Sequence, residues 1–483
     1  MLTTDEIKRF IEEDKSDDRK YYARIGQRYY EAEHDIRDYR LYYYDGEGNL
    51  VEDTTRSNIK ISHPFFTELV DQAVQYLFGG SERFAKSDIP ELQNELDDAM
   101  NNNDDFRAEI TECMTDSKVK GFGYVYLYKN KDGRICIQCA DSLGVIEVRA
   151  KDTEDKCDYV IYYYTERVGK DNKLITKVEV WNDKECWFYD IDGNGNIELD
   201  TDEKVNPRPH ILYRKGNDEQ LYYDDFGMIP YFRLDNNKKR MSDLKPIKEL
   251  IDDYDLMSCG LSNNLQDISE GIYVVSGFKG DNLDELIQNL KVKKTIGVDE
   301  NGGVDIKTIN IPYQARQVKL AEDEKNIYRF GMGLNSAQVG DGNVTNVVIK
   351  SRYSLLDLKC NKFEIKLKQF LRRILEVMLK DINEKKGTDY RAEQVYFEFE
   401  RNIITNASDN ASIKLTEAQT KQVGVQTMLS LYQLLGDETV VRQVCDVLDL
   451  DYDDIKDKLP TPDENPEGEI DDAQNSLDEV EAV

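Results

Sequence analysis

The stretch that decides the fold class is residues 347–386, which read VVIKSRYSLLDLKCNKFEIKLKQFLRRILEVMLKDINEKK. Apolar residues within it are spaced alternately by four and three, the period of a helix with one buried face. They are Leu356, Cys360, Phe363, Leu367, Phe370, Ile374 and Val377. At a rise of ~1.5 Å per residue, the predicted helix spans about 60 Å. This length exceeds that of an ordinary globular domain and indicates a large, elongated assembly.

The residues before this helix predict a loop and two further long helices. Residues 331–346 contain four glycines, one charged residue and no aromatic residue, a composition typical of a loop. One helix is expected from Pro312 to about Phe330. Another is expected from Met241 to Ile268, where apolar residues recur at spacings of three and four.

A small mixed insertion is predicted between these two helices. Residues 271–278 predict a strand and residues 283–290 a short helix. Residues 295–311 predict a hairpin that turns at Asn301-Gly302-Gly303, because glycine and asparagine favour tight turns.

The N-terminal part predicts helices followed by a β region. Residues 1–45 are expected to be helical, and Asn58–Ser62 is a short alternating stretch. His63-Pro64 opens a helix for which Ser62 is the expected cap. Its apolar positions are Phe65, Phe66, Leu69, Val70, Val74, Leu77 and Phe78, and it ends at Gly79-Gly80.

Residues 121–235 change to a period of two, which predicts a mostly antiparallel β region. Its strands are expected at 122–128, 134–139, 159–164, 177–181 and 185–189, with turns at Asp132-Gly133 and at 192–195. After the longest helix, the chain predicts a strand at 394–400 and two or three helices up to 459. Residues 461–483 carry nine acids and no base, which predicts disorder. The fold class is therefore α+β.

The net charge of −32 argues against a protein that grips DNA and reads its sequence, because such proteins neutralise phosphates with Lys and Arg. A conduit through which DNA slides remains compatible with this charge. No stretch reaches the ~18 apolar residues of a membrane helix, and the N-terminus resembles neither a signal nor a transit peptide. The eight cysteines are scattered, which favours a reducing compartment over a disulfide framework.

No motif predicts an active site. Gly80–Ser87 resembles a phosphate-binding loop but follows a helix, so a helix-ending turn is expected. Asp190–Ile197 resembles the start of a calcium loop, but strands flank it and its twelfth position is Thr201. The pair Cys136 and Cys139 points to opposite faces of a strand and lacks further ligands. His34, His63 and His210 lie far apart in sequence with no nucleophile motif beside them.

Basic residues are in local excess only in the long helix, with eleven Lys or Arg against five acids between 350 and 386. A solvated helix face is the simpler interpretation. The alternative is that Lys350 and Arg352 lie near phosphate, with Lys238, Lys239 and Arg240 as a second candidate contact.

The order of these elements resembles that of the portal proteins of long-tailed bacteriophages. The resemblance covers roughly residues 20–455 and is carried by several stretches. The first are Asn58-Ile59, His63-Pro64-Phe65-Phe66, Leu69-Val70-Asp71-Gln72 and Tyr76-Leu77-Phe78-Gly79-Gly80. The later ones are Gly227-Met228-Ile229-Pro230-Tyr231, Asn236-Asn237, Ser242-Asp243-Leu244 and Leu250-Ile251-Asp252-Asp253-Tyr254-Asp255.

The resemblance implies a ring, usually of twelve subunits, and a division of the chain into named modules. These are a wing (1–237), a first stem helix (238–269), a clip (270–311), a second stem helix (312–330), a tunnel loop (331–346), a long wing helix with a strand (347–408), a crown (409–459) and an acidic disordered tail (460–483).

The resemblance also implies site residues and partners. The tunnel loop would face DNA with Asn335, Ser336, Gln338, Asn343, Thr345 and Asn346. The clip would dock other proteins through Asp281, Glu285, Lys291, Lys293 and Lys294. Expected partners are further copies of the chain, the terminase large subunit, a head-completion adaptor, the major capsid and scaffolding proteins, and double-stranded DNA without sequence specificity. No cofactor, metal, catalytic residue or membrane is expected.

The expected function is a channel at one capsid vertex of the virion, assembled in the host cytoplasm, for packaging and ejecting DNA. It would nucleate capsid assembly and hydrolyse nothing itself. Two alternatives are a scaffold or adaptor that binds only protein, favoured by the acidity, and a nucleotide-driven translocase, suggested by residues 80–87.

Overall fold

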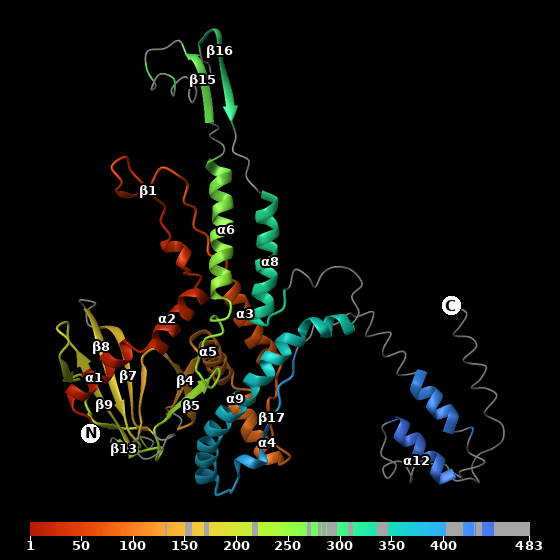
Figure 1. Cartoon of the computed structure of the whole chain (residues 1–483). Coiled ribbons are helices and arrows are strands. Elements are labelled where there is room, and N and C mark those ends of the chain that lie inside the picture. The colour runs from red at the N-terminus through yellow and green to blue at the C-terminus, as the bar shows by residue number, and fades with distance from the viewer. Residues whose placement is uncertain are drawn as a thin grey trace. The chain divides into compact units, whose positions relative to one another are not determined.

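The computed structural model describes residues 1–130, 133–149, 157–168, 173–214, 221–267, 272–278, 282, 286, 297–307, 313–335, 346–401, 419–428, 430 and 437–448. The chain divides into two compact units (Figure 1). The first unit comprises Met1–Asp341 with Lys350–Ile403, and the second Gly342–Ile349 with Ile404–Val483. Helices and strands are both abundant, so the predicted α+β class is confirmed.

The N-terminal helices cover a sheet of antiparallel strands. Helix α1 (Thr4–Lys15) begins with a capping box between Thr3 and Glu6, and α2 (Asp18–Tyr30) follows. The sheet order is β10-β9-β8-β7-β6, with β11 (Arg208–Pro209) also paired to β9. The other strands are β6 (Val145–Arg149), β7 (Cys157–Val168), β8 (Lys173–Trp181), β9 (Glu185–Ile191) and β10 (Ile197–Leu199). Ile7 and Ile11 of α1 pack on one face of this sheet, where Val178 and Trp187 are buried.

A second sheet, of order β14-β4-β5, packs beside α5 (Asp104–Lys120). Its strands are β4 (Phe122–Lys129), β5 (Ile135–Ala140) and β14 (Tyr231–Asp235). Gly121 joins α5 to β4 at a φ of 93°, and a side chain there would collide with the carbonyl oxygen of Arg240. The predicted antiparallel β region is confirmed, and the start of its central strand β4 packs tightly against the backbone of Arg240.

Shorter elements complete the first unit. Helix α3 (Phe65–Val74) continues as a π-helical turn (Gln75–Gly79), and α4 (Pro90–Leu96) leads into another (Asp97–Asn101). Three of the four two-stranded sheets among the described residues are β1 (Tyr42–Tyr44) with β2 (Leu50–Glu52), β12 (Ile211–Arg214) with β13 (Leu221–Asp224), and β3 (Ala85–Lys86) with β17 (Tyr396–Phe397). A short 3-10 helix spans Asp35–Asp38 and another Ala392–Gln394.

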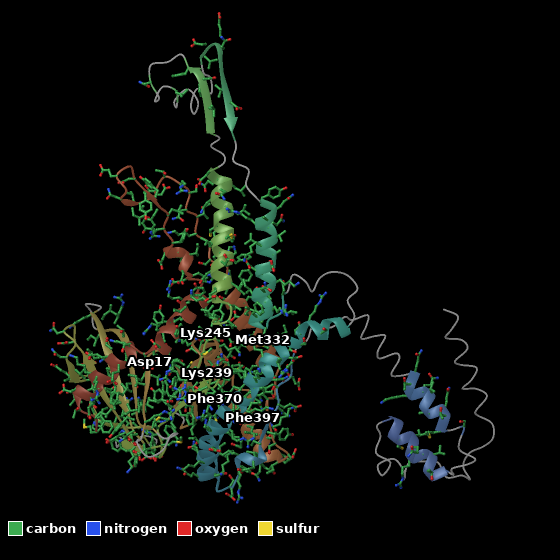
Figure 2. The ribbon with its side chains drawn as sticks, in the orientation of Figure 1. Asp17, Lys239, Lys245, Met332, Phe370 and Phe397 are labelled. Carbon is green, nitrogen blue, oxygen red and sulfur yellow. The ribbon has the colours of Figure 1, made fainter. Side chains whose placement is uncertain are left out.

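The longest helix is α9 (Asn346–Lys386), which agrees with the prediction from its apolar stripe. All stripe residues are buried except Val377, which is half-buried. Phe370, labelled in Figure 2, is fully buried. Cys360 donates from Sγ to the carbonyl oxygen of Ala73, and Tyr353 stacks on Tyr76. The helix is therefore a central support for α3 and its π-helical turn.

The two long helices predicted on either side of the insertion are present, with one altered boundary. They are α6 (Lys248–Asp267) and α8 (Tyr313–Gly331). Residues 243–247 form turns instead of the start of α6. Pro246 explains the late start, because a proline disfavours the helical conformation of the residue before it and lacks an N–H donor.

The insertion between these helices corrects a second prediction. Strand β15 (Ile272–Phe278) pairs with one continuous strand, β16 (Val298–Lys307), so Asn301-Gly302-Gly303 is not a turn. The register shifts between Ser276 and Phe278, where Gly277 has a φ of 65° and Gly302 lies against the Ser276 carbonyl. Gly277 adopts the backbone conformation of the bulge, and Gly302 allows the two backbones to approach closely. The helix predicted at 283–290 lies outside the described residues, apart from Leu286.

Several smaller predictions were wrong. Tyr42–Tyr44 is a strand instead of part of a helix, and the predicted strand 394–400 is reduced to Tyr396–Phe397. Ser62 does not cap α3, whose N-cap is Pro64 without a side-chain hydrogen bond. In the second unit, helices are described at 419–428 and in α12 (Asp437–Leu448), where Val440 and Cys445 are buried. The tail 461–483 lies outside the described residues.

A buried ionic cluster joins the root of the stem to the rest of the unit. Asp243 Oδ2 lies 3.0 Å from Lys359 Nζ of α9 and 3.5 Å from Lys118 Nζ of α5. Asn236 donates to the other carboxylate oxygen at 2.8 Å. Burial alone would raise the pKa of Asp243, but the two ammonium groups outweigh it and hold that pKa well below its usual range. Lys359 also donates to the carbonyl oxygen of Gly331, at the end of α8.

Replacing Asp243 by Asn is expected to lower the free energy of unfolding by ~3 kcal/mol. The amide keeps the shape but leaves Lys118 and Lys359 buried without their counter-charge. Urea denaturation of the purified protein measures the loss. Asp389→Asn, at an exposed ion pair with Arg391, is the control and should change stability by less than ~0.5 kcal/mol. Equal losses in the two variants would contradict this role of Asp243.

Candidate nucleic-acid interface

The two stem helices α6 and α8 contact each other along their length. Lys319 of α8 lies 2.5 Å from Asp253 of α6 and 2.5 Å from Asp323, four residues further along its own helix. About one turn before Lys319 on α8, the guanidinium of Arg316 lies beside Gly260 of α6, where the missing side chain leaves room for it. Asp323 and Ile327 are buried on the face of α8 that carries these contacts. The predicted stem is therefore a two-helix unit held by charge and close packing.

An extended segment, residues 57–63, runs along another side of α6. Every second backbone N–H of this segment bonds to a side chain of α6 at every fourth position. Ser57 bonds to Asp267 at 3.2 Å, Ile59 to Asn263 at 2.6 Å, Ile61 to Cys259 at 3.2 Å and His63 to Asp255 at 3.0 Å. Two extended residues span ~6.6 Å and four helical residues ~6.0 Å, so the two repeats match. The alternation of Asn58–Ser62 thus reflects pairing with a helix.

This ladder ends at a buried cluster of two histidines and one aspartate. Asp255 Oδ2 lies 2.6 Å from His34 Nδ1, and Oδ1 lies 2.7 Å from His63 Nδ1. The other ring nitrogen of His34 is 3.3 Å from the carbonyl oxygen of Tyr29, whose ring stacks on His34. Both neighbours of His34 are hydrogen-bond acceptors. Burial alone would raise the pKa of Asp255, but hydrogen bonds from the two histidines lower it.

Sequence reasoning did not bring these three residues together. His34 precedes a 3-10 turn, His63 precedes α3, and Asp255 lies in the middle of α6. Ser258 Oγ lies 3.5 Å from His63 Nε2, too far for a strong hydrogen bond. The cluster joins three elements, and the expectation that His34 and His63 are structural agrees with their contacts.

The start of the predicted tunnel loop is anchored to α3. The side-chain amide of Gln72 accepts from the N–H of Leu334 at 3.0 Å and donates to its carbonyl oxygen at 2.7 Å. Asn335 donates to Glu324 of α8 at 2.9 Å. Met332, labelled in Figure 2, has a φ of 56°, which turns the chain out of α8. These hydrogen bonds therefore hold the backbone in place just after the end of α8.

The other predicted tunnel-loop residues Ser336, Gln338, Asn343 and Thr345 lie outside the described residues, as do the clip residues Asp281, Glu285, Lys291, Lys293 and Lys294. Asn346 is the first residue of α9, and Lys350 lies four residues further along. Arg352 is half-buried on the same helix. Lys238 and Lys239 are exposed in the turn after β14. The DNA contacts predicted for these residues stay predictions.

Part of the basic excess of α9 serves internal contacts. The guanidinium groups of Arg372 and Arg373 donate to the carbonyl oxygens of Ala392 and Arg233. Lys385 and Lys386 pair with Asp381 and Glu95. Arg372, Arg373, Lys386 and Lys359 thus fasten the long helix to its neighbours. Other bases of the helix, such as Lys362 and Lys380, are exposed, as expected for a solvated face.

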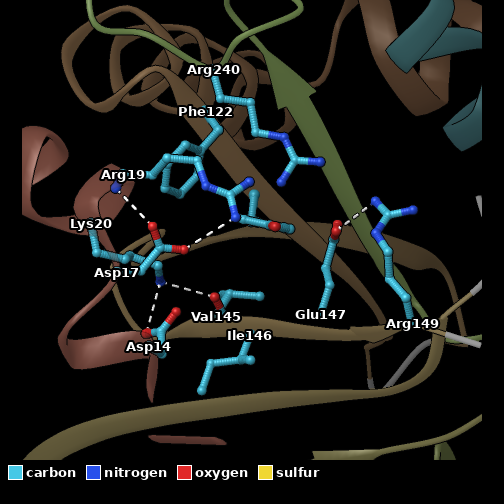
Figure 3. Close-up of a pocket in the computed structure, with 11 residues that line it drawn as sticks. Asp14, Asp17, Arg19, Lys20, Phe122, Val145, Ile146, Glu147, Arg149 and Arg240 are labelled. Carbon is cyan, nitrogen blue, oxygen red and sulfur yellow. Dashed lines mark hydrogen bonds and ion pairs between the residues drawn. The ribbon is translucent and has the colours of Figure 1, made fainter. Parts of the chain in front are cut away.

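Arg240 lines a cavity of about 400 Å³ between α2 and the sheets (Figure 3). The Nε atom of Arg240 lies 3.5 Å from Asp235. Other basic groups of the cavity are also paired: Arg19 with Asp17, Lys20 with Asp14 and Arg149 with Glu147. The cavity is therefore nearly balanced in charge and offers an anion little net attraction.

The motifs that resembled other sites have structural explanations. Gly80 ends a helix, and Lys86 of β3 pairs with Glu398 at 2.7 Å. Residues 192–196 form the turn between β9 and β10, where the Asp192 carboxylate accepts from the N–H groups of Asn194 and Asn196. Among the described residues, no group of three His, Cys, Asp or Glu side chains is placed to hold a metal ion. No described helix is long and apolar enough to cross a membrane.

Replacing Asp255 by Asn is expected to destabilise the protein by ~3 kcal/mol at pH 7, because the buried acceptor of two histidines loses its charge. The native pKa of this carboxyl lies below the unfolded value of about 3.9, so its contribution is present above that pH. It is lost as the pH falls through the native pKa. Urea denaturation at several pH values should therefore show a difference from wild type that shrinks below pH ~4.

Asp253→Asn is the matched control on the same helix. Its carboxylate is partly exposed and bound to Lys319, so a loss of at most ~1 kcal/mol is expected. A difference between wild type and Asp255→Asn that stays constant into strong acid would rule out the ionised carboxylate as its cause.

Comparison with known proteins agrees with this architecture. The family model described as "Phage portal protein, SPP1 Gp6-like" matches residues 9–449. The portal protein of Bacillus phage SPP1 is 29% identical over 389 residues, which cover 80% of this chain and 75% of that protein. The portal protein of Clostridium phage phiCD119 is 26% identical over 387 residues, covering 76% and 79%. The chain belongs to the SPP1 Gp6-like family of phage portal proteins.

Proposed function

We propose that this chain is one subunit of a ring that conducts double-stranded DNA through one vertex of a phage capsid. The observation that carries the proposal is the order of parts around the stem. Two paired helices are followed by a loop anchored at Gln72 and then by a helix of 41 residues, within a family match over residues 9–449.

The physical properties of the chain suit a passive conduit. Its net charge of −32 disfavours tight binding of DNA, so a duplex can slide. No active-site constellation is found in the described part of the chain, and Lys86 of the phosphate-loop resemblance is held by Glu398. The energy for packaging would come from the ATPase of a separate motor. Repeated copies packed edge to edge close into a ring without free ends.

The proposal assigns roles to the predicted site residues. Residues 331–346 form the tunnel loop, Lys350 and Arg352 contact phosphate near it, and Lys238 and Lys239 offer a second contact. Residues 270–311 dock the terminase large subunit during packaging and a head-completion adaptor afterwards. The ring, of about twelve subunits, assembles in the host cytoplasm, nucleates the capsid with scaffolding and major capsid proteins, and remains in the virion.

Negative-stain electron microscopy of the purified protein is the first test. Class averages along the symmetry axis should show rings with an open centre wide enough for a duplex, ~20 Å. Rings without such a pore would favour the scaffold that binds only protein. Persistently monomeric protein, together with particles that package DNA without it, would overturn the proposal.

A double variant, Lys350→Ala with Arg352→Ala, tests the phosphate contacts. Rings should still form, but the fraction of particles that retain a full genome should fall several-fold, because each lost contact weakens the hold on the backbone without affecting sequence preference. Lys362→Ala with Lys380→Ala, which removes two exposed bases further along the same helix, is the control. Equal packaging by both variants would remove Lys350 and Arg352 from the site.

A further inference from the structure

The hairpin of β1 and β2 exposes large apolar side chains on both of its strands. Tyr43 faces Val51 and Tyr44 faces Leu50 across two antiparallel strands. Every residue of both strands is exposed, with 74% for Tyr44 and 60% for Leu50. An isolated two-stranded hairpin is marginally stable in water, and large exposed apolar patches mark interaction sites. The hairpin therefore has the properties of a docking element.

The hairpin is nevertheless held firmly at both ends. Asp45 closes its turn by accepting from the N–H groups of Glu47 and Asn49. At its base, the N–H of Asp53 donates to the carbonyl oxygen of Leu41, and the Asp53 carboxylate binds Arg56 at 2.5 Å. The chain then enters the 57–63 ladder along α6. Because this ladder begins at Asp267, the hairpin lies at the C-terminal end of α6.

A second uncharged surface lies at the same level of the stem, on α8. Tyr313, Gln314, Gln317, Val318 and Ala321 share one face of this helix and are all exposed, Val318 by 68%. The opposite face carries buried Asp323 and Ile327 and the Lys319 contact with α6. Since Arg316 lies beside Gly260, these first turns of α8 are near the C-terminal part of α6. No charge interrupts this face, although 33% of the chain is charged.

Electrostatics limits where two copies of this chain can touch. Each copy carries a net charge of −32, so surfaces rich in acid repel one another. The hairpin strands carry only Glu52, which pairs with Arg40 at 3.4 Å, and the α8 face carries no charge. The two surfaces lie on different sides of α6, as Figure 1 shows. A contact between different surfaces of identical copies repeats from copy to copy and can close a ring.

We propose that the β1–β2 hairpin of one subunit docks on the exposed α8 face, residues 313–321, of the next subunit. The three tyrosines and Leu50 supply the apolar contact, and Gln314 and Gln317 supply partners for the tyrosine hydroxyls. The inference rests on the proposed ring, because it assigns the element that joins neighbouring stems. It makes the hairpin an intersubunit clamp anchored on α6.

Photo-cross-linking of assembled protein tests the contact. Tyr44 is replaced by p-benzoylphenylalanine, which keeps an aromatic ring, and the covalent dimers are isolated by size and mapped by mass spectrometry. The expected result is dimers joined between position 44 and residues 313–321. The same replacement at Tyr223, exposed on the comparable β12–β13 hairpin, is the control and should give no dimers joined to that face. Dimers joined elsewhere, or adducts only with another virion protein, would overturn the proposal.

A second measurement separates docking from folding. The variant Tyr42→Ser/Tyr44→Ser/Leu50→Ser should reduce the yield of rings about tenfold, while thermal unfolding of the subunit stays close to wild type. The control triple Leu212→Ser/Tyr213→Ser/Tyr223→Ser removes equivalent exposed side chains and should form rings normally.

The outcomes distinguish the two proposals. Wild-type rings together with normal ring formation by the hairpin variant would refute the clamp and leave the channel function intact. Absence of rings from wild-type protein, even in particles, would refute both.

Discussion

The ionic contact of Asp243 with Lys118 and Lys359 is the interaction on which the rest of the first unit depends. Three elements converge there: α5 under the second sheet, the turn that precedes α6, and the long helix α9. Through Lys359 the cluster also holds the end of α8. Lys118 in addition lies 4.0 Å from the ring centre of Phe363, within the apolar stripe of α9. A single half-buried carboxylate therefore links α5 and α9 to the turn before α6, and through Lys359 to the end of α8.

The stem is stabilised differently on its two sides. Towards α8, α6 uses an ion pair and a glycine that admits a guanidinium. Towards residues 57–63 it uses polar side chains that replace the missing strand partners of an extended backbone. The ion pair and the bonds to the extended backbone satisfy polar groups that would otherwise be costly to bury. Polar contacts on two sides thus help to stabilise α6, which does not rely on a broad apolar face alone.

Elements with long, regular sequence patterns were predicted correctly, whereas elements with short or weak patterns were not. The stripe from Leu356 to Ile374 and the alternating strands of residues 121–235 were predicted well, because each pattern is long and regular. Asn301-Gly302-Gly303 was predicted as a turn because its composition favours one. In the structure these residues lie within β16, which pairs with β15 across a bulge. The tyrosines of β1 gave no strand signal, because neither face of that hairpin is buried.

The helices around the candidate site were predicted from local patterns, but their contacts were not. The loop after α8 and the paired helices could be placed from composition and period. The cluster of His34, His63 and Asp255 could not, because it joins residues about 200 positions apart without a local motif. Its only sequence signals were His63-Pro64 and Asp252-Asp253-Tyr254-Asp255, which carried the family resemblance.

The ladder along α6 has a consequence for sequence divergence. Residues 57, 59 and 61 contribute only backbone groups to it, whereas Asp267, Asn263 and Cys259 contribute their side chains. Sequence divergence among relatives should therefore differ between the two partners. At positions 57, 59 and 61 the ladder tolerates any side chain except proline, while the helix must keep an acceptor at every fourth position. A contact that looks symmetrical in space is thus encoded almost entirely on one of its two partners.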